Sequence, residues 1–305
     1  MQWGHIKTLF ILSFLILNIY LLIQFVDRQK DSDLGVLDSE EQSYEELLAS
    51  ENISIPDLNQ DVTEASYINV SDKKFTSEEM DQLNSMEDLD AALVEDNFIL
   101  AQFEDPLLVP ANANAARITD IVEPYLLYPS EYQYWAWNEE ANILLFFQVK
   151  DGSRPIYSNQ NALLLFYLND KDEITHYTQT MLGEAEQQGN AETLLPPLNA
   201  IGSLYDRGTL TQDEKVTELE LGYLSRIESQ VFAPTWRITI NHEENYFINA
   251  IENLTYPGDD MEFLESTITN YMEKIEALPE EEELKEPFEA VIDQKFEEEN
   301  RSETE

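Results

Sequence analysis

The chain has 305 residues, of which 62 are acidic and 17 are basic, and its formal charge is −45. A surface this negative repels nucleic-acid phosphates and anionic lipid headgroups, so nucleic acid is excluded as a partner of the soluble part. The chain contains no cysteine, which excludes disulfides, a thiolate nucleophile and a zinc–thiolate site. With 43% apolar residues, it has enough material for a folded core.

The first element along the chain is an apolar run from Leu9 to Val26. Fourteen of its residues are Leu, Ile, Phe or Val, and about eighteen nearly uncharged residues mark a membrane span rather than a core helix. We therefore predict a short cytoplasmic amino terminus over residues 1–5 and a single transmembrane helix over residues 6–26.

A cleaved secretory signal is the competing interpretation of this run. Such a signal ends in a small-residue cleavage site, whereas Asp27-Arg28-Gln29-Lys30 follows the run here. Positive charges flank both ends and do not orient the span. Because few residues precede it and a long chain follows, we expect a single-pass protein of the cell membrane with an extracellular carboxyl-terminal domain.

Two acidic segments are predicted to lie outside the folded part. Residues 27–60 read as an acidic stalk, since the stretch from Asp31 to Ser66 has eleven acidic residues and no basic one. Residues 279–305 hold twelve acidic and three basic residues and are predicted to form an acidic disordered tail. Apolar residues there would line one side of a helix induced by a partner: Phe288, Val291, Ile292 and Phe296.

A first α+β unit is predicted over residues 61–110. It begins with a strand at Tyr67–Val70, and Thr76 and Glu79 then have the spacing of a capping box. A strand at Asn97–Phe103 closes the unit. Between them, apolar residues recur at three- and four-residue intervals and predict one long helix face: Met80, Leu83, Met86, Leu89 and Leu93.

The main α+β domain is predicted over residues 111–278, as antiparallel β-sheets with packed helices. Apolar runs separated by turn residues predict strands: Ile143–Val149, Ala162–Leu168, Ile174–Thr180, Val216–Leu224, Thr235–Ile240 and Tyr246–Ile251. A short helix is expected from Pro196-Pro197 to Gly208. An amphipathic helix is expected from Met261 to Leu278, either covering a sheet face or docking a partner.

The sequence has no pattern typical of catalysis or metal binding. It lacks a nucleophile elbow, a phosphate-binding glycine loop and an H-E-x-x-H box. Its three histidines are His5, His176 and His242; the last is followed by two Glu residues but by no second histidine. We therefore predict no catalytic residue, no metal ligand and no cofactor. The aromatic stretch Tyr132–Trp137 predicts a half-buried strand, with a carbohydrate-stacking surface as the alternative.

Several stretches resemble the YycI family of YycH/YycI accessory proteins over residues 1 to about 255. They are Met1-x-Trp3 with Lys7-Thr8-x-Phe10-Ile11, Leu17-Asn18-x-Tyr20-Leu21-Leu22, Lys150-Asp151-Gly152-x-x-Pro155-Ile156, Phe166-Tyr167-Leu168-Asn169, Asn199-Ala200-Ile201-x-x-Leu204-Tyr205, Pro234-Thr235-Trp236-Arg237-Ile238 and Tyr246-Phe247-Ile248-Asn249-Ala250. The chain departs from the family pattern in its acidity and in the stretch after Tyr256.

The resemblance implies a membrane-anchored regulator of low-GC Gram-positive bacteria rather than an enzyme. Such proteins lie outside the membrane and adjust the sensor histidine kinase WalK (YycG) of the WalRK two-component system, which governs cell-wall metabolism. It implies protein–protein contacts with WalK and YycH, partly within the membrane, an α+β soluble part and no cofactor. A membrane-anchored cell-envelope enzyme and a passive ligand-binding envelope module remain the alternatives.

Asn18 suggests how the predicted span could contact a partner. An amide near mid-span leaves hydrogen-bonding groups unsatisfied in lipid, and an interhelical hydrogen bond is worth on the order of 0.6–2 kcal/mol. The alternative is that the amide stays unpaired or reaches water. The predicted contact stripe comprises five residues: Phe14, Asn18, Leu21, Leu22 and Phe25.

Overall fold

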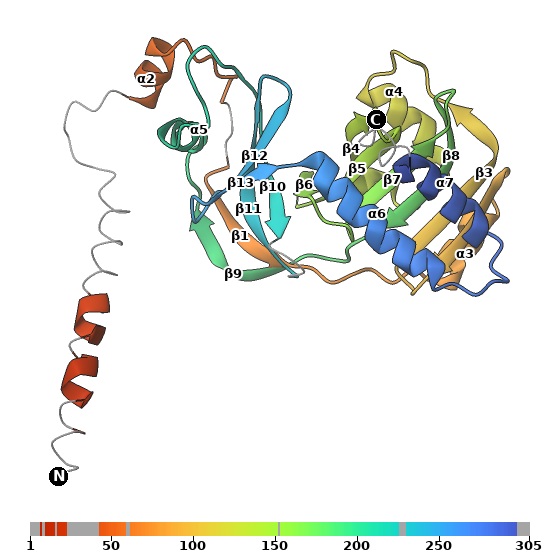
Figure 1. Cartoon of the computed structure of the whole chain (residues 1–305), viewed down its shortest axis with the longest axis horizontal. Coiled ribbons are helices and arrows are strands. Elements are labelled where there is room, and N and C mark those ends of the chain that lie inside the picture. Colours follow the sequence, from red (N-terminus) through yellow and green to blue (C-terminus); the bar gives the residue numbers. More distant parts are fainter. Residues whose placement is uncertain are drawn as a thin grey trace. The chain divides into compact units, whose positions relative to one another are not determined.

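Figure 1 shows the computed structural model of the chain. The structure describes residues 7, 10–15, 17–22, 43–58, 62–151, 153–225 and 230–297. These residues divide into two units, Met1–Leu47 and Leu48–Glu305, and the second unit contains the folded domain.

In the first unit, residues 10–15 and 17–22 are helical, and their large apolar side chains are exposed. Within the part of the chain that the structure describes, no helix is long and apolar enough to cross a membrane. The predicted span also includes residues 6, 8, 9, 16 and 23–26, which lie outside the described residues. The amino terminus over residues 1–5 and residues 27–42 of the predicted stalk lie outside them too.

The second unit is a mixed α+β domain built on a 13-stranded sheet, confirming the predicted fold class for the folded part. The first part of this sheet, here called the first sheet, has six antiparallel strands. In spatial order they are β2 (Leu89–Val94), β3 (Phe98–Leu108), β8 (Glu173–Thr180), β7 (Leu163–Leu168), β5 (Ile143–Lys150) and β4 (Tyr132–Asn138).

The remaining strands form the second sheet, which is joined to the first through the short strand β6 (Arg154–Tyr157). Its central strand β11 (Val231–Ile240) pairs with β10 along one edge, and with β12 and β1 along the other. The other strands are β10 (Val216–Ser225), β12 (Glu244–Asn249), β13 (Thr255–Gly258), β1 (Glu64–Asn69) and β9 (Glu186–Thr193).

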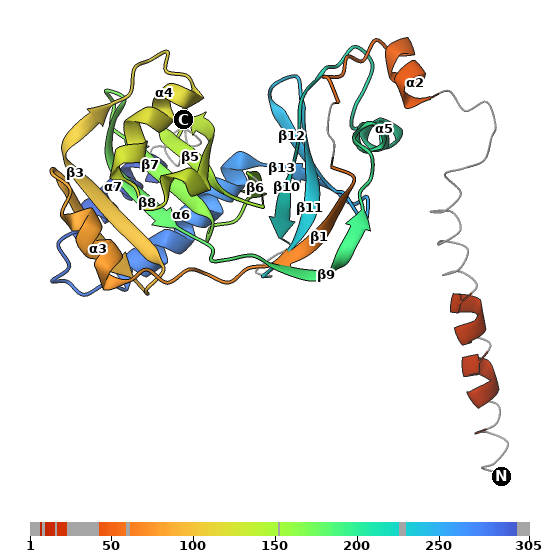
Figure 2. The same cartoon turned by 180° about the vertical axis from the view of Figure 1, so that it is seen from behind.

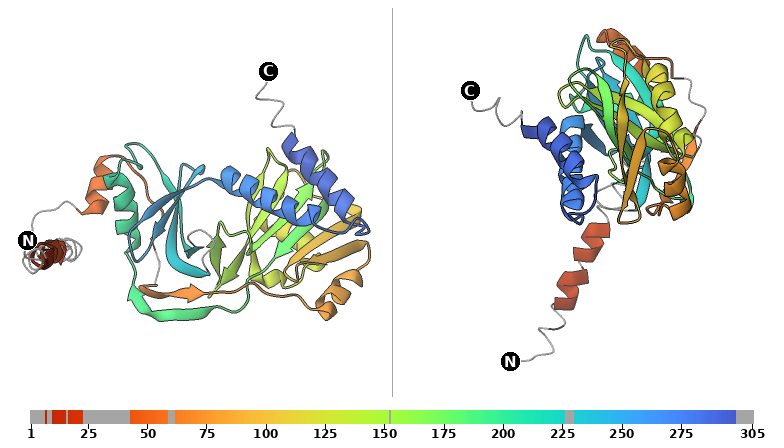
Figure 3. Two further views of the ribbon diagram at one scale, coloured as in Figure 1. Left: turned by 60° about the horizontal axis from the view of Figure 1, so that its bottom comes forward. Right: turned by 90° about the vertical axis from the view of Figure 1, so that its right-hand side faces the viewer.

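Helices cover both faces of the first sheet (Figure 3). Helices α3 (Ser77–Asn84) and α4 (Ala115–Val122), with the short 3₁₀ turns η1 (Glu123–Tyr125) and η2 (Pro129–Glu131), lie on one face. Helices α6 (Asp260–Glu276) and α7 (Lys285–Glu297) lie on the other. Every residue of β7 is therefore buried, since side chains alternate across a strand and both directions meet a core.

The second sheet is covered more sparsely. Helix α5 (Pro197–Asp206) packs Ala200, Ile201 and Leu204 against Trp236 and its neighbours on β11. Helix α2 (Tyr44–Ser50) contributes Leu48 to the same core. Since Leu48 and Ile53 are buried, the later part of the predicted stalk belongs to the folded domain instead.

The helix predicted from the capping box is shorter than expected. Thr76 and Glu79 form the predicted capping box, but α3 ends at Asn84, and Leu89 and Leu93 lie in strand β2. Ser85 caps the end of α3, and Asp88, in a left-handed conformation with φ 64°, turns the chain directly before β2. The apolar spacing continues beyond the end of α3 because Leu89 and Leu93 pack into a core from strand β2 as well.

Two predicted boundaries also differ from the structure. Strand β3 pairs along β8, so residues 61–110 and 111–278 belong to one body rather than to successive units. Within the predicted disordered tail, Lys285–Glu297 form α7, because Phe288 and Ile292 are buried against the first sheet. Residues 298–305 and the side chain of Phe296 lie outside the described part.

Candidate functional site

The two sheets meet at β6, which pairs with one strand from each. It pairs antiparallel with the end of β5 and parallel with β10 through Ile156 and Tyr157. A Cβ on Gly222 of β10 would lie 2.4 Å from the Tyr157 ring and 2.5 Å from the Pro155 carbonyl oxygen. Only glycine permits this approach, so the close contact of the sheets depends on that residue.

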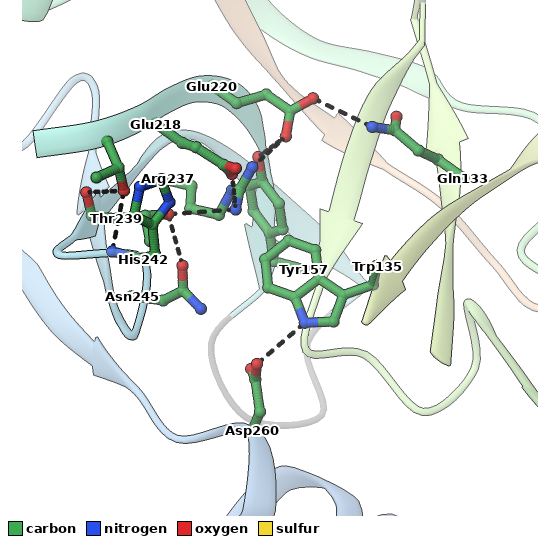
Figure 4. Close-up of polar contacts among 11 residues, drawn as sticks. Gln133, Trp135, Tyr157, Glu218, Glu220, Arg237, Thr239, His242, Asn245 and Asp260 are labelled. Atoms are coloured by element: carbon green, nitrogen blue, oxygen red, sulfur yellow. Dashed lines mark hydrogen bonds and ion pairs between the residues drawn. The ribbon is translucent and has the colours of Figure 1, made fainter. Parts of the chain in front are cut away.

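A partly buried arginine bridges the sheets beside this contact (Figure 4). The Arg237 guanidinium on β11 lies 2.9 Å from a Glu218 carboxylate oxygen and 3.0 Å from one of Glu220, both on β10. It also lies over the Trp135 ring of β4, 4.6 Å from the ring centroid. One cation therefore joins two strands of the second sheet to one of the first, through an ion pair and a cation–π contact.

The start of α6 joins the same cluster. The Trp135 indole N–H donates to an Asp260 carboxylate oxygen at 3.1 Å, and the Tyr157 hydroxyl donates to Glu220 at 3.4 Å. Burial raises the pKa of Asp260, while the Trp135 N–H and Arg237 oppose that rise. These residues, with Arg237, Glu218 and Gly222, are here called the junction cluster.

The protonation states of the junction cluster favour a structural role. Burial alone would lower the pKa of Arg237, but Tyr157 and the two glutamates raise it overall. Burial, followed by the charge of Glu220, raises the pKa of Tyr157 well above its usual value. Arg237 therefore stays cationic and Tyr157 stays neutral near pH 7, so neither can exchange protons there as an acid–base catalyst needs.

The structure places the two described histidines, His176 and His242, apart from each other. His176 is buried on β8 beneath Phe288 of α7, and burial lowers its pKa to about 4. His242 is exposed in the turn between β11 and β12, and His5 lies outside the described residues. Among the residues that the structure describes, no group of His, Asp and Glu could hold a metal ion.

Another shifted carboxylate, Glu79, lies far from the junction, in the layer of α3. Partial burial would raise its pKa, but hydrogen bonds from Tyr128, Thr76 and Lys73 lower it to about 2. Asp260 begins a helix on the opposite face of the first sheet. These two carboxylates therefore do not share a cleft, unlike the paired acids of a hydrolase.

The aromatic stretch on β4 is a half-buried strand with rings on both faces. Tyr134 contacts Phe146, with ring centroids 5.4 Å apart, and Trp135 contacts Phe147 at 4.9 Å. These rings belong to the two cores on opposite sides of the first sheet. Their positions explain the aromatic pattern by packing.

The described residues of the predicted contact stripe lie on the amino-terminal helical stretch. Phe14, Leu21 and Leu22 are all more than half exposed. The Asn18 side-chain amide donates to the Phe14 carbonyl oxygen at 2.9 Å, so one of its N–H groups is satisfied within the helix. Phe25 lies outside the described residues.

Sequence reasoning missed the junction cluster. The available signal was one arginine within an apolar strand, together with two glutamates at alternate positions in the predicted strand Val216–Leu224. Cross-strand pairing places Glu220 opposite Arg237. The contribution of Trp135 depends on how the two sheets meet, which no local pattern shows.

Comparison with known proteins identifies the family. A sequence model of the YycI protein matches residues 32–251, which is more than half of the chain. The chain belongs to the YycI family. This family comprises accessory regulators of the YycG (WalK) two-component system and is not known to include enzymes. The matched stretch contains the junction strands β6, β10 and β11, whereas α6 and α7 lie beyond it.

The other comparisons are more distant. A search of curated proteins finds no match. The fold is similar to the crystal structure of an uncharacterized protein from Eubacterium rectale, with TM-score 0.39, 10% identity, and coverage of 68% of this chain and 91% of that one. It is also similar to the Bacillus megaterium YpeB C-terminal domain, with TM-score 0.36, 10% identity, and coverage of 73% and 99%.

Proposed function

We propose that this YycI-family chain is a membrane-anchored regulator of the WalK (YycG) sensor kinase and acts together with YycH, thereby tuning cell-wall metabolism. Its amino terminus lies in the cytoplasm and its folded domain outside the membrane. It works by protein–protein contacts made by the membrane helix and by the domain. The observation that carries the proposal is the family match over residues 32–251.

The apolar amino-terminal run supports the anchoring part of this proposal. Its described helical residues expose large apolar side chains from Phe10 to Leu22, and such a surface is stable in lipid rather than in water. Because lipid removes the hydrophobic drive between helices, a partner would be held by close packing and polar groups. The stripe of Phe14, Asn18, Leu21, Leu22 and Phe25 supplies both.

The folded domain supports a regulatory rather than a chemical role. Its junction cluster joins two sheets through Arg237, whose pKa is raised, beside Tyr157, whose pKa is raised well above its usual value. Such a body offers its partners surfaces of fixed shape. In this proposal the anchor holds the domain beside the kinase, and the effective concentration of the domain there is correspondingly high.

The test is to exchange residues 1–30 for an unrelated single-pass anchor and to measure expression of WalRK target genes. We expect regulation to be lost although the domain stays exported and folded. A narrower test replaces Asn18 by Leu, which should weaken association with WalK by about threefold or more if its remaining polar groups bond a partner.

Ser13→Leu is the matched control for this narrower test, because residue 13 lies about 140° around a helix from residue 18. It should leave association unchanged. Full regulation by the chain with the exchanged anchor would contradict the intramembrane part of the proposal. A chain that associates with neither WalK nor YycH would contradict the proposal as a whole.

A further inference from the structure

We infer that the open edge of strand β9 receives an extended, lysine- or arginine-bearing segment of a partner protein, which adds a strand to the second sheet. This inference rests on the proposed function and names the part of the domain that makes the contact. Its starting observation is that all eight residues of β9 are exposed.

Strand β9 pairs with β1 and with no other described strand (Figure 2). Among the described residues, strand β1 in turn reaches the rest of the second sheet through Ile68 and Asn69, which pair with the start of β11. The β1–β9 pair therefore extends from the sheet with its outer edge uncovered. Such an edge presents N–H and C=O groups that can pair with another chain.

Of the strands that the structure describes, β2, β4 and β13 also pair on one side only, but each is protected. On β2, the Ala91 N–H donates to the Asn84 side chain at 2.8 Å. Strand β13 has four residues and includes Pro257, which has no N–H to donate. Strand β4 lies against helix α4.

Strand β9 has none of these side-chain protections. Its sequence Glu-Gln-Gln-Gly-Asn-Ala-Glu-Thr includes neither lysine nor proline, the residues that commonly block open edges. Its irregularity is the register shift opposite Ala65–Tyr67, near Gly189 with φ 81°. The shift divides the regularly paired part of β9 into residues 186–188 and 192–193, so an added strand makes a few backbone hydrogen bonds along the edge as a whole.

The charge of β9 and of the chain determines which kind of strand can pair with the open edge of β9. A second copy of this chain also carries a charge of −45, so long-range repulsion opposes pairing between two copies. The only charged residues of β9 are Glu186 and Glu192, which favour a strand with basic side chains opposite them. The charge that disfavours self-association therefore favours a basic partner.

A groove beside β9 strengthens this preference. It has a volume of about 540 Å³ and is lined by residues that include Gln187 of β9, Glu131, Asp151 and Glu184. Its one basic residue, Lys150, is already 3.0 Å from a Glu131 carboxylate oxygen. Asp151 is likewise paired, 2.7 Å from the Arg154 guanidinium, so Glu184 is the carboxylate that a basic side chain of the added strand can meet in the groove.

The absence of cysteine from the chain permits a direct test. Gln188→Cys creates a unique thiol on β9, to be labelled with a short photo-crosslinker on the full chain in membranes that also hold WalK and YycH. We expect a crosslink to one of these two proteins, at a segment with basic residues. Asp90→Cys on the protected β2 edge is the matched control and should give at least tenfold less product.

A second measurement tests the charge preference. The double variant Glu186→Lys and Glu192→Lys should weaken capture of the partner by about tenfold. The control Glu262→Lys and Glu265→Lys changes the same charge on exposed residues of α6 and should have little effect. Thermal unfolding of each variant should confirm that the domain still folds.

The outcomes separate this inference from the proposed function. If the unmodified chain captures neither WalK nor YycH, the proposed function fails. If capture occurs but the β9 label gives no more product than the β2 label, the inference is overturned and the proposed function stands. A product between two copies of the chain also overturns the inference, because it names a different occupant.

Discussion

The two sheets of this domain differ in how much of their surface is covered by helices. The first sheet has helices on both faces, and β7 is buried at all six positions. The second sheet packs α5 and α2 on one face, and it ends in β9, which is exposed at all eight positions. The same chain thus contains a strand with no solvent contact and a strand with no cover.

This difference indicates that the two sheets have different roles. A sheet with two cores loses much apolar burial if it opens, so it is suited to hold shape. A sheet with an uncovered edge is suited to contact other proteins. The junction cluster connects the two, so its integrity determines whether the domain behaves as one body.

The largest effect is expected where the first sheet is most deeply buried. Phe166 is fully buried between Phe146 and Tyr177, with ring centroids 5.6 and 5.4 Å away. Phe166→Ala should lower the free energy of unfolding by about 3–5 kcal/mol, since it leaves a cavity in the core between the first sheet and helices α3 and α4. Urea unfolding followed by circular dichroism measures the loss.

Gln187→Ala on β9 is the comparison for this variant. Its exposed side chain should contribute less than about 0.5 kcal/mol. Equal losses from both substitutions would remove the proposed contrast between the sheets.

The junction should give an intermediate effect. Arg237→Met removes a cation that is 13% exposed and leaves Glu218 and Glu220 without it. We expect a loss of about 2 kcal/mol, below the value for a fully buried pair, because Glu218 is half exposed and partly solvated. Hydrogen exchange should then become faster in β10 and β11 before it does in β7.

Arg237→Lys is the control at the junction. It keeps the charge but loses the planar guanidinium that spans two carboxylates and stacks on Trp135. An intermediate loss is expected. If exchange accelerates equally in both sheets of the Met variant, the junction is not a boundary between separately opening parts.

The smallest effect concerns pH and the contact of α7 with the first sheet. Burial lowers the pKa of His176 to about 4, below its ordinary value near 6.5. Above pH 6.5 the group is neutral in both states and contributes nothing. Below it, the unfolded chain binds the proton first, so stability is lost as the pH falls from 6.5 towards 4.

The measurement is the difference in unfolding free energy between pH 7 and pH 5.5. The chain should lose about 1 kcal/mol more than the His176→Gln variant does. Restricting the range to pH 5.5 avoids most carboxylate titration. An identical pH dependence in the two proteins would show that His176 takes up its proton in the folded state.

Sequence patterns predicted the elements whose apolar residues pack into a core. Ile143–Val149 and Ala162–Leu168 are continuous apolar runs because both faces of their strands meet a core, and the structure has β5 and β7 there. The three- and four-residue spacing from Met261 likewise predicted α6. In these elements, the local sequence pattern and the tertiary packing favour the same secondary structure.

Prediction failed where tertiary contacts, rather than the local sequence pattern, determine the structure. The polar sequence of β9 gives no strand signal, because backbone pairing with β1 alone holds it. Composition averaged over residues 279–305 hid Phe288 and Ile292, which stabilise α7 by burial. The junction cluster was missed for a third reason, since Trp135 and Arg237 meet only after both sheets have formed.

The position of β1 in the sequence has a consequence for the order in which the chain assembles. This strand is synthesised before either of its neighbours, since β9 and β11 both follow it at a long distance in the chain. The hairpins of the first sheet, by contrast, can close as soon as they emerge, because their partners are close in sequence. Residues 64–69 therefore remain unpaired until β9 and β11 have been synthesised, so the strand pair that offers its edge to a partner forms later than the local hairpins of the first sheet.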